Sequence, residues 1–135
     1  MNKVCIVTGA SRGMGYGIAK VLAEEEGATV YATARSKKAL DDLSASTKDS
    51  LGVIHPCVLD QADDGAVEKF VLNVIAKEKQ IDLLVNSAYG GLTAMAPHFG
   101  KPFWERPVSV FDASMNIGLR SAFVISKFVA PHMVE

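Results

Sequence analysis

The chain has 135 residues, enough for one domain with a sizeable buried core. Hydrophobic residues make up 49% of it and charged residues 21%, a composition that excludes a disordered or fibrous protein. The formal net charge of −1 gives no global positive field of the kind that attracts nucleic acid or an acidic membrane, so neither is an expected partner and any anion site must be local.

The apolar run that begins at Val4 breaks after Val7, which is too short for a signal peptide or a membrane span. We therefore expect no membrane segment and a cytoplasmic, reducing setting. Cys5 and Cys57 both lie in apolar runs and are expected to behave as small buried hydrophobes rather than as disulfide or metal partners. The three histidines are scattered without ligand spacing, so no metal site is expected.

Short apolar runs alternate with longer amphipathic stretches, the pattern of parallel strands joined by crossover helices. The runs are rich in β-branched and aliphatic residues, as in a sheet buried on both faces. The expected strands are residues 3–7, 29–33, 53–59 and 82–85. With short right-handed connections, the expected strand order is 3-2-1-4.

Three helices are expected between the strands, at residues 14–26, 37–48 and 63–79. The first is expected to end at Gly27, and the third to begin at Asp63 and Asp64. Helical spacing predicts apolar inward faces made of Met14, Ile18 and Leu22 in the first helix, Leu40 and Leu43 in the second, and Val67, Phe70, Val71, Val74 and Ile75 in the third.

After the fourth strand, residues 90–107 mix glycine, proline and polar residues and are expected to form a long loop. Phe103 and Trp104 are expected to pack this loop rather than bind a partner. A long fourth helix is expected to follow Pro107 and to continue toward the end of the chain, and no strand is expected after it.

The first expected strand is followed directly by a glycine-rich turn, Thr8-Gly9-Ala10-Ser11-Arg12-Gly13-Met14-Gly15. Glycines at such a strand-to-helix turn permit unusual φ and ψ, a close approach of the backbone to a pyrophosphate, and tight packing of the helix on the sheet. Free N–H groups at the helix start then face the phosphates. The alternative is a turn without a ligand, but its position between strand and helix favours nucleotide binding, and a P-loop lysine is absent.

The end of the second strand indicates which nucleotide is bound. NAD enzymes carry an acidic residue about 20 residues beyond the glycine turn, whereas this chain has Arg35 there. A guanidinium at Arg35 can bind a 2′-phosphate bidentately, and Arg12 in the turn can reach the same group. NADP(H) is therefore the expected cofactor, the alternative being that both arginines are solvated surface charges.

The glycine turn and the segment Asn86-Ser87-Ala88-Tyr89 resemble motifs of the short-chain dehydrogenases/reductases. The resemblance covers the whole chain and implies an α/β fold with a doubly wound parallel sheet, Rossmann-like, truncated after the fourth strand and the following helix. Residues 1–135 would form a single partial NAD(P)-binding domain. Segments 103–107 and 116–120 further resemble one particular member of the family.

The same resemblance implies roles for single residues. Asp60 would accept a hydrogen bond from the adenine amino group, although it could equally cap the helix that follows. Asn86 would hold sheet and loops together beside the cofactor ribose, with Ala88 lining the site. Ser87 and Tyr89 depart from the family's Asn-Asn-Ala-Gly, and the Tyr89 ring stands where a glycine lets the backbone lie close to the cofactor.

In the family, a tyrosine moves the proton with help from a lysine four residues on, a serine and an asparagine. Asn116 matches the asparagine, the alternative being a helical polar group bonded to neighbouring backbone. Tyr16 and Lys20 have the tyrosine–lysine spacing, but they lie in the first crossover helix beside the glycine turn and are not expected to be catalytic. The serine and the true pair would follow a fifth strand, so no turnover is expected of this chain alone.

Together these patterns predict an NADP(H)-dependent oxidoreductase acting on a small-molecule carbonyl or alcohol. The alternative is a non-catalytic nucleotide-binding or dimerising module. A homodimer is implied by the resemblance, because the family commonly dimerises through the long fourth helix.

Overall fold

The sheet of this protein has four parallel strands in the order β3-β2-β1-β4, as predicted. In this computed structural model, the described residues are 2–134. The strands are β1 (Val4–Thr8), β2 (Thr29–Ala34), β3 (Val53–Val58) and β4 (Leu83–Val85), each within one residue of its expected bounds. In register, Ile6 of β1 stands between Tyr31 of β2 and Leu84 of β4.

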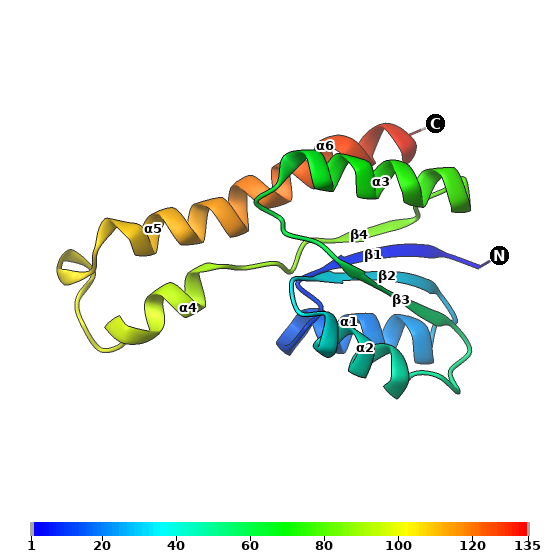
Figure 1. Cartoon of the computed structure of the whole chain (residues 1–135), viewed down its shortest axis with the longest axis horizontal. Helices are drawn as coiled ribbons and strands as arrows, with labels where there is room; N and C mark the ends of the chain where they lie inside the picture. The colour runs from blue at the N-terminus through cyan, green and yellow to red at the C-terminus, as the bar shows by residue number, and fades with distance from the viewer. Residues whose placement is uncertain (1, 135) are drawn as a thin grey trace.

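Helices cover both faces of the sheet, which confirms the doubly wound architecture (Figure 1). One face carries α1 (Gly13–Glu24) and α2 (Lys37–Ser46), and the other carries α3 (Asp64–Glu78) and α6 (Ser121–Val129). Alternate residues of β1 enter the two cores: Cys5 and Val7 pack beneath α1 and α2, whereas Val4 and Ile6 pack beneath α3 and α6. This alternation is the two-residue period of a strand buried on both sides.

The buried face of α1 differs from the expected one. Met14 is 80% exposed and Ile18 is also exposed, while Gly15, Ala19 and Ala23 are buried. The reason is the short distance between helix and sheet, because a Cβ atom at Gly15 would overlap the carbonyl group of Gly9. The positions directly beneath α1 take only small side chains, so Met14 and Ile18 point away from the sheet, while Leu22 is partly buried against the core as predicted.

The other two crossover helices follow the prediction. Leu40 and Leu43 of α2 are fully buried, as are Val67, Val71 and Val74 of α3, with Phe70 and Ile75 partly buried. Side-chain caps set their starts: Ser36 Oγ accepts from the amide of Ala39 at 3.3 Å, and Asp63 Oδ1 accepts from the amide of Ala66 at 3.0 Å.

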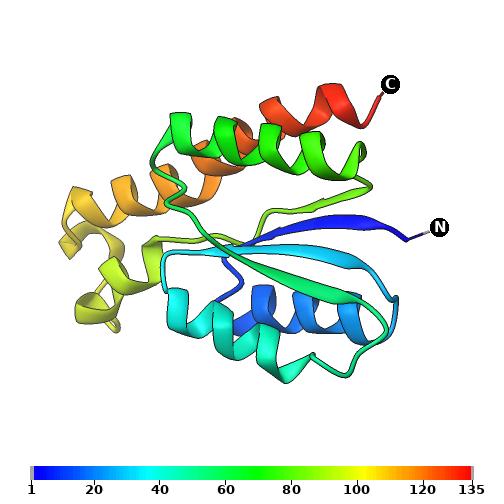
Figure 2. The same ribbon diagram turned by 45° about the vertical axis from the view of Figure 1, so that its right-hand side comes forward.

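Residues 90–107 are not the structureless loop expected. They contain α4 (Gly91–Met95) and the single-turn 3-10 helices Ala96–His98 and Phe103–Glu105, while α5 (Val108–Ser114) follows. Helices α4 and α5 run side by side past the carboxyl ends of the strands (Figures 1 and 2). We call residues 91–114 the α4–α5 arm.

The expected long fourth helix is bent. Between α5 and α6 the chain makes a wide, π-type segment, Met115–Arg120, in which Ile117 has non-helical angles of φ −105° and ψ 71°. Beyond α6 a last 3-10 turn spans Ala130–His132. Within residues 86–134 no strand follows β4.

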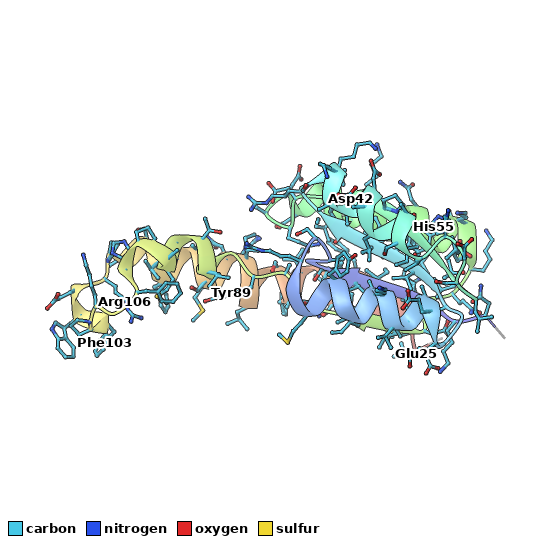
Figure 3. All side chains as sticks on the ribbon, turned by 90° about the horizontal axis from the view of Figure 1, so that it is seen from below. Glu25, Asp42, His55, Tyr89, Phe103 and Arg106 are labelled. Carbon is cyan, nitrogen blue, oxygen red and sulfur yellow. The ribbon has the colours of Figure 1, made fainter. Side chains whose placement is uncertain are left out.

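Phe103 and Trp104 do not pack the segment that contains them, contrary to expectation. They are 77% and 73% exposed and contact each other edge to face, with ring centroids 5.4 Å apart. Phe103 lies at the far end of the arm, away from the sheet (Figure 3). The single 3-10 turn that carries them provides no interior large enough for two such rings.

The stretch from Val108 to His132 is long and apolar enough, by length and composition alone, to cross a membrane, although no membrane segment was expected. Only 22% of its most apolar window is buried. Its inner side packs on the sheet layer through Val124, Ile125 and Val129.

The two cysteines follow the expectation. Both are free thiols, Cys5 buried and Cys57 half-buried, and burial raises the pKa of each.

Candidate nucleotide-binding site

A cavity of about 690 Å³ opens at the carboxyl ends of the strands. Most of the residues singled out from the sequence meet in its wall: Gly9, Ser11, Arg12, Gly13, Met14, Arg35, Asp60 and Ala88. The others, Thr8, Gly15, Asn86 and Asn116, do not line it. The structure thus brings four separate chain segments to one edge of the sheet, where ligands of open α/β sheets bind.

The glycine turn is shaped by backbone angles that other residues rarely adopt. Gly9 and Gly13 have φ of +65° and +59°. Gly9 also lies against the segment after β4, because a Cβ atom there would come within 2.7 Å of the Ala88 Cα. Gly15, outside the cavity wall, lets α1 close onto the turn.

Thr8 holds the two halves of the site together. Its Oγ1 accepts hydrogen bonds from the amides of Ser87 and Ala88, both at 3.1 Å, and donates to the Val85 carbonyl at 3.4 Å. The side chain is buried in these contacts, so it fixes the segment after β4 instead of facing the cavity.

Asn86 faces away from the cavity and connects the same segment to α6. Its Nδ2 donates to Ser126 Oγ at 3.2 Å. The contact is of the kind that the resemblance implied, a link between the sheet edge and a neighbouring element.

Arg12 and Arg35 supply the positive charge of the cavity. Both are exposed, and within residues 2–134 neither forms an ion pair with a carboxylate. The nearby lysines of α2 differ, since Lys37 pairs with Asp41 and Lys38 with Asp42 one helical turn on. The two guanidinium groups are therefore available to an anion.

Asp60 does not cap α3, so that alternative is wrong. Its carboxylate accepts from the amide of Ala62 at 2.9 Å, in a tight turn, and the cap of α3 is Asp63. Asp60 remains exposed at the cavity wall.

The next residue, Gln61, was not singled out from the sequence. It lines the cavity, is buried, and its Nε2 donates to Thr33 Oγ1 at 3.5 Å. Its place three residues beyond the carboxyl end of β3, at the edge of the sheet where ligands bind, is the signal that could have indicated it.

One wall of the cavity comes from the α4–α5 arm and was also missed. It is formed by Leu92, Thr93, Ala94 and Ala113 of the arm, by Gly90 and Ile117 beside its two ends, and by Tyr89, whose ring was expected near the cofactor. No local sequence pattern marks these residues, because their distance from the glycine turn depends on the direction that the chain takes after β4.

Asn116 lies in the wide turn between α5 and α6 and is exposed. Its carbonyl accepts from the Ser121 amide five residues on, and its neighbour Ile117 reaches the cavity. Wide turns of this kind are frequent at functional sites.

Tyr16 and Lys20, which have the tyrosine–lysine spacing, both lie in α1. Tyr16 packs against the core beneath α1, and Lys20 lies 3.7 Å from Glu24. Neither residue lines the cavity. Across residues 2–134, no group of three or more His, Cys, Asp or Glu side chains is arranged to hold a metal ion.

A doubly wound parallel sheet with a glycine turn at its carboxyl edge defines a Rossmann-like nucleotide-binding protein. The model of the short chain dehydrogenase family matches residues 3–135. The chain therefore belongs to the short-chain dehydrogenase family, as the motifs indicated.

Among curated relatives, dehydrogenase/reductase SDR family member 1 of Mus musculus is 40% identical over 137 residues, which cover 98% of this chain and 42% of that protein. This is the member that segments 103–107 and 116–120 resemble. The human protein of the same name is 38% identical over 134 residues, with the same coverage. The chain thus spans less than half the length of either relative.

Solved structures show the same fold. A metagenomic short-chain oxidoreductase in complex with NADP superposes with a TM-score of 0.84 at 30% identity, over 98% of this chain and 57% of that one. A xylitol dehydrogenase bound to NAD⁺ gives a TM-score of 0.83 at 29% identity, over 98% and 48%. Structures with NADP and with NAD⁺ match about equally well, so the fold does not distinguish the two cofactors. Any preference has to come from the residues of the site.

Proposed function

We propose that this chain is the N-terminal, cofactor-binding part of an NADP(H)-dependent oxidoreductase, forming one partial Rossmann domain. The reaction is hydride transfer between the nicotinamide and a small-molecule carbonyl or alcohol. The observation that carries the proposal is the pair of guanidinium groups, Arg12 and Arg35, at the cavity wall without carboxylate partners among residues 2–134.

The residues present fit such a cofactor. Amides of the glycine turn and the start of α1 would hold the pyrophosphate, where the helix dipole favours negative charge. Asp60 would accept from the adenine amino group, and Arg35 with Arg12 would bind the 2′-phosphate. The cavity volume of about 690 Å³ is in the usual range of ligand pockets.

The 2′-phosphate distinguishes the two cofactors. A carboxylate at the end of β2 would repel this phosphate and bind the 2′-hydroxyl of NAD. At this place the chain has Ala34 and Arg35, both in the cavity wall, so a bound 2′-phosphate would face positive charge instead. NADP(H) is favoured on charge alone.

Proton transfer in this reaction needs residues besides those that line the cavity. Asn116 is our candidate for the asparagine that orders a water in the proton relay. We propose that the tyrosine, lysine and serine of the family come from the part of its members that this chain does not match, and that residues 1–135 alone have no turnover.

Calorimetric titration of the chain with NADPH and with NADH tests the proposal. Removing a charged hydrogen-bond partner costs about 1.5–3 kcal/mol, so Arg35→Ala is expected to weaken NADPH binding about 10- to 100-fold and NADH binding little. Lys38→Ala is the matched control, because Lys38 is paired with Asp42. Equal affinity for both cofactors, unchanged in Arg35→Ala, would refute NADP(H) preference.

A further inference from the structure

Tyr89 stands where the family has a glycine, and its ring is directed onto the bent helix. The ring lies against Gly118, where a Cβ atom would be 3.4 Å from Tyr89 Cδ2. The Tyr89 hydroxyl is 3.1 Å from Ser114 Oγ, which itself donates to the Val110 carbonyl at 2.8 Å. Since the one Ser114 proton is used on Val110, the tyrosine is the donor to Ser114.

The two glycines after Tyr89 let the backbone follow the ring onto the helix. The Gly90 amide donates to the Ile117 carbonyl at 2.7 Å, and a Cβ atom at Gly90 would come within 2.9 Å of the Ile117 Cβ. A side chain at Gly91 would overlap both Ser114 and the Tyr89 hydroxyl. Tyr89, Gly90 and Gly91 thus form one close contact with the helix, which we call the Tyr89 clamp.

The clamp acts on the backbone where the helix is irregular. Ile117 has left the helical conformation, so its carbonyl needs a hydrogen-bond donor from outside the helix, and Gly90 provides it. On the far side of the bend, Arg120 binds both carboxylate oxygens of Asp64 in α3, at 2.8 and 2.6 Å. Asn116 directly precedes Ile117, within the stretch from Ser114 to Gly118 that the Tyr89 clamp contacts.

We propose that Tyr89 is a positioning residue that fixes the bend at Ile117 and thereby fixes where Asn116 stands beside the cofactor cavity. Only the role assigned to Asn116 rests on the proposed function. The Tyr89 side chain emerges where the sheet meets the arm (Figure 3), and both Tyr89 and Ile117 line the cavity. The bend is thus coupled to the cavity wall through the side chain that replaces the family's glycine.

Hydrogen exchange followed by mass spectrometry tests the clamp in Tyr89→Gly, Tyr89→Phe and Ser114→Ala. Tyr89→Gly removes ring and hydroxyl, and we expect amide exchange at Gly90 and residues 117–121 to speed up about tenfold or more, the effect of losing about 1.4 kcal/mol of local stability. Tyr89→Phe keeps the ring, and a lost neutral hydrogen bond of about 1 kcal/mol predicts a rise of about fivefold.

The hydrogen bond between the Tyr89 hydroxyl and Ser114 gives a second prediction for these variants. Adding Tyr89→Phe to Ser114→Ala should cause no further increase in exchange, because Ser114→Ala, which also removes the bond to Val110, has already removed the Tyr89–Ser114 hydrogen bond. Tyr16→Phe, which alters a tyrosine outside the site, is the control. Unchanged exchange over residues 117–121 in Tyr89→Gly, with β1 amides as protected as in the parent chain, would overturn the proposal.

A second readout separates positioning from general loosening. We expect Tyr89→Gly to bind 2′,5′-ADP, which lacks the nicotinamide, within about twofold of the parent chain, while the fluorescence change of the nicotinamide on NADPH binding is reduced. Loss of affinity for both ligands would mean that the clamp merely supports the fold. If the parent chain binds neither ligand, the proposed function fails. The exchange rates then still test whether Tyr89 fixes the bend at Ile117.

Discussion

Gly9 and Gly13 share a left-handed backbone, but they differ in what surrounds them. A Cβ atom at Gly9 would meet the backbone of Ser87 and Ala88 within 2.7–2.8 Å, whereas one at Gly13 would have nothing within 4 Å. Gly9 is therefore required both by its φ and by close packing, and Gly13 by its φ alone.

This difference predicts unequal effects of alanine. A left-handed non-glycine residue costs about 1–2 kcal/mol, and forced overpacking adds about 1–3 kcal/mol. Gly13→Ala should lower the free energy of unfolding by the first amount, and Gly9→Ala by the sum. Urea denaturation of both variants measures this, and equal losses would contradict the close approach of Gly9 to Ala88.

Single residues with charge were well predicted from sequence where a motif fixed their place. Arg12 belongs to the glycine turn and Arg35 ends a strand, so both were expected at the cavity wall, where they lie. Thr8 was expected to contact the cofactor, but its side chain holds the segment after β4 instead, whereas Asn86 makes a linking contact of the kind that the resemblance implied. A motif gives the position of a residue along the chain, but not the direction of its side chain.

At the scale of elements, the strands and α2 and α3 were predictable because their burial follows a local period. The inward face of α1 was not, since the closeness of the helix to the sheet is set by Gly15 against Gly9, a contact between the helix and the turn before it. The bend at Ile117 was also missed. It depends on Gly90 and Tyr89, more than 25 residues earlier in the chain, which no helical periodicity reports.

The edge formed by β2, β3 and α3 predicts a pH dependence of stability. His55 of β3 stacks on the Tyr31 ring at 4.9 Å, and burial, followed by the nearby Lys77 charge, lowers the His55 pKa below its ordinary 6.5, with Glu78 opposing. The unfolded chain therefore binds more protons than the folded chain as pH falls below about 7, and stability decreases there.

Replacing the histidine should remove this loss. We expect the melting temperature of the parent chain to fall more between pH 7.5 and 5.5 than that of His55→Gln, because glutamine does not titrate. Thermal melts at several pH values provide the measurement. Parallel pH profiles for the two proteins would show that His55 is as easily protonated in the folded state as in the unfolded one.

For the molecule as a whole, the bent helix exposes several large apolar side chains. Phe111, Leu119 and Phe123 are all at least 60% exposed, and they lie on the same long helical stretch that packs its other side on the sheet layer. An apolar surface of this kind on a folded chain is typical of an interaction face. Its position agrees with the expectation of a homodimer through this helix.

We expect the 135-residue chain to self-associate through this face. Phe123→Glu places a charge there and should shift the sedimentation coefficient toward that of a monomer, whereas Leu72→Glu, at an exposed apolar residue of α3, should not. Sedimentation velocity over a range of concentrations gives the answer. Self-association that persists equally in both variants would place the interface elsewhere.

The cavity is also a property of the whole molecule, since its walls come from the glycine turn, from the segments that end β2, β3 and β4, and from the α4–α5 arm. Sequence motifs located all of these segments except the arm. The arm was missed because a segment rich in glycine and proline gives no sign of the short helices that tertiary contacts stabilise.

The central claim is that the cavity recognises a 2′-phosphate, and the most direct measurement compares 2′,5′-ADP with 5′-AMP by calorimetric titration of the chain at low and raised salt. We predict that 2′,5′-ADP binds at least about tenfold more tightly, that Arg35→Ala removes most of this difference, and that salt reduces it. Equal binding of the two nucleotides, with no effect of Arg35→Ala, would contradict the claim.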